Sequence, residues 1–150
     1  LVVGLSVPLI HINYAAKALS LDFSKNQQSH AASSLYTSIN DYRYFMQTLL
    51  LPDKQHADAV ALMLQPQIKI NNELAWGMGL ALEMRNQRVD SFWQWGSNID
   101  FQSFMLGYPQ QKTGIVILTN SSTGLKIIPD IVSRGLGIRL KPQPWWQQLP

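Results

Sequence analysis

The chain has 150 residues, of which 46% are hydrophobic and 14% are charged, so it can bury a core and is not a disordered chain. Its formal net charge is +3, but its 12 Lys and Arg residues are scattered between Lys17 and Lys141, which argues against a nucleic-acid-binding surface. The absence of cysteine excludes a disulfide framework and a thiolate site.

Residues 1–30 are an N-terminal segment with two open interpretations. Leu1–Ile10 is uncharged and apolar, but too short to cross a bilayer, which takes about 20 residues. An Ala-x-Ala pattern at residues 16–18 can mark signal cleavage, although no basic region precedes it. The segment is therefore either signal-like, with Leu1–Ile10 as a possible membrane contact, or the truncated boundary of a longer protein. Residues 31–150 are predicted to form one domain.

The best amphipathic helix is predicted where apolar side chains recur every three or four residues, at Leu35, Ile39, Tyr42, Met46 and Leu49. Thr37 or Ser38 is expected as its N-cap, with Asp41 in the first turn. A second, short helix is expected from about Gln55 to Leu64, with Asp53 as its cap.

An antiparallel sheet is predicted after a connector at residues 65–72. Residues 74–95 are predicted to form one hairpin, because two apolar stretches flank the polar turn at residues 85–87. Gly77 and Gly79 lie inside the first stretch, where glycine suits a bend or a close approach of another backbone.

A second hairpin is predicted from residues 101–108 and 114–119, turning through residues 109–112. Its second strand is rich in β-branched residues, which is typical of a buried central strand. Residues 121–136 are predicted to be helical in their second half, closed by Gly135 and Gly137. The order of helices, three or four strands and a helix predicts an α+β fold with helices flanking an antiparallel sheet.

The sequence contains no complete set of catalytic motifs. The three histidines, His11, His30 and His56, lack metal-ligand spacing, so neither a metal nor a cofactor is predicted. One literal motif is residues 112–114, Lys-Thr-Gly, a triplet found in the active sites of serine β-lactamases and penicillin-binding proteins. Here the triplet follows a hairpin turn, whereas in those enzymes it lies on the strand ahead of the hairpin. We interpret it as a chance match.

A longer stretch resembles class C β-lactamases and related serine hydrolases. Those proteins have a Lys-Thr-Gly or His-x-Gly triplet, a short link, Phe-x-Ser, a strand ending in Pro, and a Val/Ile-rich strand ending in Asn. This chain has, in that order, Gln94-Trp95-Gly96, Phe101-Gln102-Ser103, Tyr108-Pro109 and IVILTN at residues 115–120. The resemblance covers about residues 30–137 and implies the C-terminal part of a β-lactamase/transpeptidase-like domain.

The resemblance implies that one wall of a substrate site is formed by Gln94, Trp95, Gly96, Ser97 and Asn98. The position of Gln94 is Lys or His in the family, and a neutral amide can hydrogen-bond without supplying positive charge. Gly96 would let the substrate backbone approach the strand, and the backbone N–H of Ser97 would be an oxyanion-hole donor. Asp100 adds a negative charge to a link that is usually rich in Gly. The neutral Gln94 and this charge argue against ordinary β-lactam turnover.

The catalytic residues of the family have no counterpart in this chain. Ser-x-x-Lys and Tyr-x-Asn are both absent. Without a nucleophile no acyl-enzyme can form, so we assign no catalytic residue and expect the chain alone to be inactive. For the complete protein, the resemblance implies acyl transfer from a β-lactam, peptide or ester, a small-molecule or peptidoglycan-like substrate, and a periplasmic or secreted location.

Two alternatives stay open. The chain is either part of such a hydrolase, with the N-terminal half or a second copy as its partner, or a non-catalytic relic of the fold that binds peptidoglycan or a protein. For the Trp-rich stretch at residues 92–98, the simpler hypothesis is a strand that only packs, with Trp93 and Trp95 on one face and Gln94 on the other.

Overall fold

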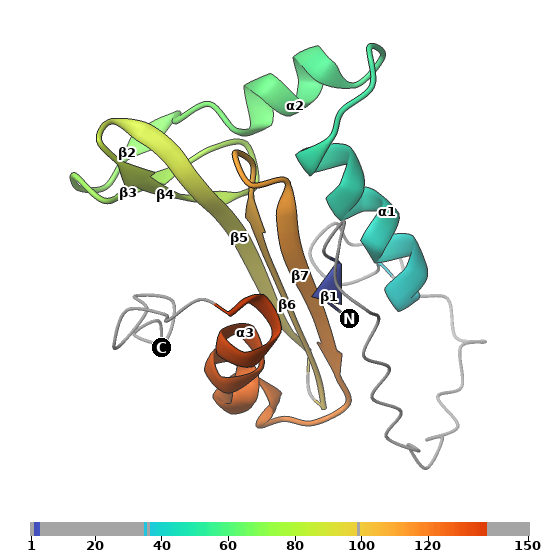
Figure 1. The fold of residues 1–150 in the computed structure, drawn as a ribbon. Coiled ribbons are helices and arrows are strands. Elements are labelled where there is room, and N and C mark those ends of the chain that lie inside the picture. Colours follow the sequence, from blue (N-terminus) through green and yellow to red (C-terminus); the bar gives the residue numbers. More distant parts are fainter. Residues whose placement is uncertain (1, 4–34, 36, 99, 138–150) are drawn as a thin grey trace, which may run out of the picture.

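A seven-stranded antiparallel sheet with helices on both faces forms the body of the chain (Figure 1). The computed structural model describes residues 2, 3, 35, 37–98 and 100–137. The strand order is β1-β7-β6-β5-β4-β3-β2. The predicted α+β class is confirmed, although six strands, rather than three or four, lie between the second helix and the last.

The strands are β1 (Val2–Val3), β2 (Ile68–Lys69), β3 (Leu74–Trp76), β4 (Ala81–Arg85), β5 (Arg88–Asn98), β6 (Phe101–Tyr108) and β7 (Thr113–Thr119). The helices are α1 (Ile39–Leu50), α2 (Ala57–Met63), the 3-10 helix η1 (Gly124–Ile127) and α3 (Ile128–Leu136). None of the helices that the structure describes is long and apolar enough to span a membrane.

Helix α1 begins where its cap residue places it. The hydroxyl of Ser38 accepts the N–H of Asp41 at 3.2 Å and donates to the Asp41 carboxylate at 2.7 Å. The bond from the Asp41 N–H satisfies one of the backbone donors that a helix leaves without a partner at its start. Leu35 lies before the helix and is 80% exposed, so its assignment to the apolar stripe was wrong. Met46 and Leu49 are buried against the sheet, as predicted.

Asp53 closes the turn that leads into α2. Its carboxylate accepts the backbone N–H of His56 at 2.9 Å, and its carbonyl accepts the N–H of Ala57, also at 2.9 Å. The prediction of Asp53 as the helix cap was therefore wrong: α2 begins at Ala57 rather than at Gln55, its N-cap is His56, and Asp53 stabilises the preceding turn.

Two predictions for the first part of the sheet were wrong. The expected connector at residues 65–72 contains β2, which pairs with β3 and is too short to show periodicity. The stretch at residues 74–84 is two strands, because the chain turns back between β3 and β4. Gly77 packs so closely on the carbonyl of Met63 that a Cβ would collide with it, and Gly79 has a φ of 77°.

The two predicted turns are present. Asn86 and Gln87 have φ values of 50° and 63°, as a two-residue hairpin loop with two left-handed residues requires. The β6–β7 hairpin turns through residues 109–112, and there Lys112 has a φ of 51°. Strand β7 is buried as predicted and lies inside the sheet, because β6 pairs with one side of it and the two-residue β1 with the other.

Two hydrophobic clusters cover the opposite faces of the sheet. The first packs α3 on side chains that include Trp93, Phe104, Leu106, Ile115 and Ile117. The second packs α1 and α2 on side chains that include Leu82, Phe92, Met105 and Val116. Figure 1 shows α1 and α3 on either side of the strands. These faces are called the α3 face and the α1 face below.

The predicted N-terminal segment is described at two residues. Val2 and Val3 form β1 and pair with Ile115 and Gly114 of β7. The Ala-x-Ala pattern and the rest of residues 4–30 lie outside the described residues, so both interpretations of the segment stay predictions. Gly137 ends α3 with a φ of 63°, in the left-handed conformation predicted for a closing glycine. Gly135 lies inside the helix, so the prediction that it also closes α3 was wrong.

Candidate functional site

The five predicted site residues lie on the last part of β5, where the sheet opens. Strand β4 pairs with β5 only as far as Trp93, whereas β6 pairs with β5 as far as Asn98. Within the residues that the structure describes, no strand pairs with the other side of residues 94–98. This side of residues 94–98 is called the open edge. It exists because the chain turns away from β5 at Gly77–Leu80, immediately before β4.

The backbone of β5 presents hydrogen-bonding groups at the open edge. Met84 of β4 donates its N–H to the carbonyl of Glu73 at 2.8 Å, on the β3 side. Peptide groups alternate in direction along a strand, so Ala81, three residues before Met84, points its N–H and C=O toward β5. Ala81 is the partner of Trp93, whose N–H and C=O therefore point toward β4. The N–H and C=O groups of Trp95 and Ser97 point the same way, beyond the point where β4 pairs.

The side chains of the site residues divide between the two faces. Trp95 packs against the cluster on the α3 face, next to Trp93, so packing accounts for both tryptophans. Gln94 and Gly96 face the other way, and both are partly buried. A Cβ at Gly96 would meet one atom within 4 Å, the hydroxyl of Ser103 at 2.9 Å. The α1 face is therefore nearly bare beside the open edge.

A residue that the sequence did not single out for a role holds the end of this strand. Gln102 is 8% exposed, and its amide nitrogen donates to the hydroxyl of Ser97 at 3.2 Å and to the carbonyl of Ser122 at 3.0 Å. Its amide oxygen accepts the N–H of Leu125 at 2.7 Å. The signal for it was periodicity, because Gln102 shares the inward phase of Phe104 on β6.

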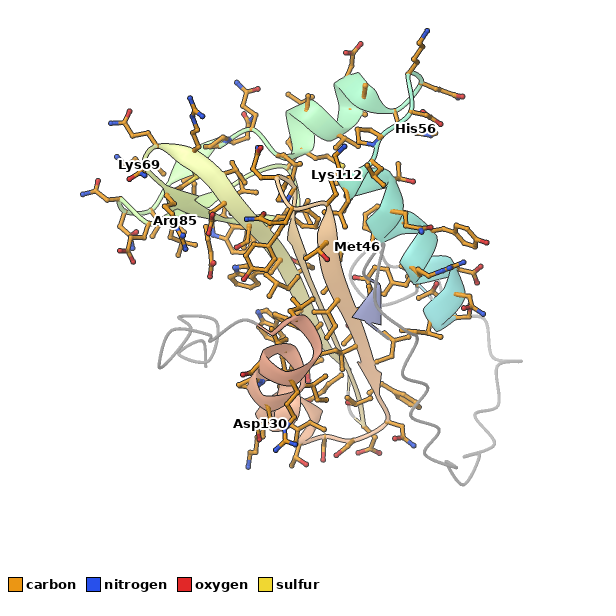
Figure 2. All side chains as sticks on the ribbon, in the orientation of Figure 1. Met46, His56, Lys69, Arg85, Lys112 and Asp130 are labelled. Atoms are coloured by element: carbon orange, nitrogen blue, oxygen red, sulfur yellow. The ribbon has the colours of Figure 1, made fainter. Side chains whose placement is uncertain are left out.

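The sequence of β5 and β6 brings little charge to the open edge. Asp100 is the single charged residue between Asp90 and Lys112 in the sequence, and it is exposed. The Lys-Thr-Gly triplet lies at the far end of β6, where Tyr108 pairs with Thr113, while Phe101 pairs with Asn98 at the open edge. Figure 2 shows Lys112 in the hairpin turn, on the side of the molecule where α2 lies.

Among the described residues, no three His, Asp or Glu side chains are grouped so that they could hold a metal ion. His56 is exposed, and its Nδ1 lies 2.7 Å from the carboxylate of Asp53. This pair belongs to the turn before α2.

Comparison with known proteins shows the fold and not the activity. No protein-family model matches the chain, and no curated protein matches it. A penicillin-binding protein from Bacillus halodurans matches over 63% of this chain, with a TM-score of 0.53 and 14% identity. SurE matches over 70% with a TM-score of 0.55 and 18% identity, and SurE with D-Leu over 70% with a TM-score of 0.54.

The chain spans 29% of the penicillin-binding protein and 26% and 27% of the two SurE structures. Its fold is therefore related to part of the penicillin-binding-protein fold. At these identities the likeness extends to the fold alone.

Proposed function

We propose that the chain is the C-terminal part of a β-lactamase-related serine hydrolase, and that its open edge is one wall of the substrate cleft. One observation carries the proposal. The strand on which the resemblance places this wall is also the strand that leaves the peptide groups of Trp95 and Ser97 without a strand partner among the described residues. The fold relation to a penicillin-binding protein supports it.

Each residue at the open edge has a chemical task in this proposal. The N–H of Ser97 donates to the oxygen that becomes negative when the acyl carbon turns tetrahedral. Gly96 leaves room for a substrate on the α1 face, where the nearest atom to an added Cβ is a hydroxyl. Gln94 donates or accepts a hydrogen bond without adding charge.

The nucleophile of this reaction is not supplied by the chain, because Ser-x-x-Lys is absent. In the complete protein, a serine hydroxyl from another segment would attack the acyl carbon and release the leaving group, and water would then hydrolyse the ester. The substrate would be a β-lactam, a peptide or a small ester, in the periplasm or outside the cell.

Binding tests the wall directly. The structure of SurE with D-Leu suggests a tripeptide ending in D-Leu as the probe, with the L-Leu tripeptide as its matched control. In ¹⁵N-labelled protein, the D-peptide is expected to shift the amide signals of Trp95 and Ser97 more than that of Lys69, on the outer edge of the sheet. Shifts confined to β2, or none at millimolar peptide, would reject the open edge as a binding wall.

Hydrolysis tests the expected inactivity of this chain. Nitrocefin and p-nitrophenyl acetate report β-lactam and ester turnover, respectively, and neither is expected to be hydrolysed faster than in buffer. Turnover that rises in proportion to protein concentration and survives repurification would contradict the assignment of no nucleophile.

A second candidate function is binding without catalysis. Phe101 is 49% exposed and Leu118 is 39% exposed, and strand register places both on the α1 face with Gly96. Exposed apolar side chains on β6 and β7, on the face that also carries Gly96, suit a partner surface, formed by the N-terminal half, a second copy or another protein. Light scattering after size exclusion should then show a complex, whereas a monomer at all concentrations would argue against self-association.

A further inference from the structure

Gln102 ties the open edge to the connection between β7 and α3. The hydroxyl of Ser97 belongs to β5, the carbonyl of Ser122 to the loop after β7, and the N–H of Leu125 to η1. One buried side chain from β6 therefore connects the end of β5 with residues 122–125, which follow β7. No other side-chain hydrogen bond to residues 94–98 is found among the described residues.

The direction of each bond follows from elementary chemistry. The N–H of Leu125 can only donate, so the amide atom that faces it at 2.7 Å must be the oxygen of Gln102. The amide nitrogen then has two hydrogens, and Ser122 and Ser97 each accept one of them. All the polar atoms of this buried amide have partners, so turning it would break three hydrogen bonds.

The hydroxyl of Ser97 is an acceptor in this arrangement and keeps its own proton. No described group accepts that proton. Ser97 itself is exposed, and its peptide group points toward the side that no described strand covers. The ladder with β6 ends one residue later, at Asn98, and backbone near the end of a ladder opens most easily unless another contact restrains it.

We propose that Gln102 is a positioning residue that fixes the direction of the Ser97 N–H at the open edge. Its consequence for chemistry rests on the proposed function, because an oxyanion-hole donor works only if it is held about 2.7–3.1 Å from the oxygen that becomes charged. The mechanical role of Gln102 rests on the hydrogen bonds alone.

Two variants separate this role from a general role in stability. Ser97→Ala removes only the hydroxyl that Gln102 holds, while the backbone N–H of residue 97 and the two other bonds of Gln102 remain. Gln102→Met keeps the length of the side chain and removes all three bonds. Ser103→Ala is the matched control, since it removes a hydroxyl from the opposite face of the same strand pair.

The measurement is the backbone order parameter from ¹⁵N relaxation, together with the melting temperature. In the natural chain, the backbone amide of Ser97 should have an order parameter of about 0.85, the value of rigid backbone. In both Ser97→Ala and Gln102→Met it should fall below about 0.6, while Trp95 and the Ser103→Ala control stay rigid. The melting temperature should fall in Gln102→Met and stay unchanged in Ser97→Ala.

Two results would overturn the proposal. In the first, residue 97 stays near the rigid value in both variants. In the second, order is lost equally at Trp95 and along β6, which would show general loosening of the sheet. Neither readout uses a ligand, so a failure of the D-Leu tripeptide to bind would reject the proposed function and leave the order parameters to decide the role of Gln102.

Discussion

Gly96 and Gly107 lie on the same hairpin, and alanine should have opposite effects at the two positions. Both glycines face the α1 side of the sheet. An added Cβ at Gly107 would collide with the ring of Phe92, which is fully buried. An added Cβ at Gly96 would meet the hydroxyl of Ser103 at 2.9 Å, and that hydroxyl can rotate away.

The expected magnitudes follow from these contacts. Overpacking a core by a methyl group costs typically 1–3 kcal/mol, so Gly107→Ala should lower the free energy of unfolding by about 2 kcal/mol. At a urea dependence of about 2 kcal/mol per molar, this moves the unfolding midpoint down by roughly 1 M. Replacing glycine by alanine without strain stabilises by about 0.4–1 kcal/mol, so Gly96→Ala should leave the midpoint unchanged or raise it by at most roughly 0.5 M.

Urea denaturation and peptide titration together decide the role of Gly96. The variant should fold normally and bind the D-Leu tripeptide at least about tenfold more weakly, a loss of about 1.4 kcal/mol, because its methyl group occupies the bare surface beside the open edge. A midpoint as low as that of Gly107→Ala would show that Gly96 is needed for packing. Unchanged affinity in a well-folded variant would show that nothing binds over it.

Three further predictions concern titration and a helix cap. Burial first, and then the charge of Glu83, raise the pKa of Tyr108 to about 12. The stability that the neutral Tyr108 side chain contributes should therefore be complete below pH 10 and lost as the pH rises through 12. Absorbance at 295 nm should show this late ionisation, and Tyr108→Phe should remove it. The hydrogen bond from the His56 side chain lowers the pKa of Asp53. The ionised Asp53 carboxylate should therefore stabilise the turn before α2 above pH 3.8, and this stabilisation should weaken as the pH falls below that value. The amide chemical shifts of α2 should change with pH in the same range, and Asp53→Asn should abolish that change. Ser38→Ala should cost about 1 kcal/mol in urea denaturation, and Ser38→Thr much less, because only the alanine variant leaves the Asp41 N–H without its cap; equal losses in both variants would reject this explanation.

Local signals predicted the elements that depend on local chemistry. Ser38 was one of two expected caps for α1 because its hydroxyl lies three residues before an N–H that needs an acceptor. The β6–β7 hairpin was predicted at nearly its observed bounds, because two apolar strands flank a Pro-containing turn. Both features are determined within a few residues of sequence.

The errors fall where a distant contact decides the structure. The stretch at residues 74–84 reads as one apolar run, and it breaks because Gly77 packs against Met63 at the end of α2. The short strand β2 exists only because Gln67 and Ile70 donate to the carbonyls of Trp76 and Leu74. No periodicity in either segment carries that information.

The candidate site combines both kinds of information. The resemblance pointed to residues 94–98, but the open edge depends on where β4 stops pairing, which follows from the turn at Gly77 and Gly79. Gln102 was visible only as a glutamine in an apolar strand. Its role required the position of η1, whose N–H at Leu125 comes from 23 residues further along the chain.

The charges along the sheet distinguish the open edge from the outer one. On the outer edge, β2 contains Lys69, and a lysine on an edge strand hinders pairing with other chains. The open edge has no such guard, because no residue from Ser91 to Asn98 is charged. An edge strand without such a charge can pair with another strand, and no described strand covers this one. A bound substrate or partner that supplies the missing strand would account for this.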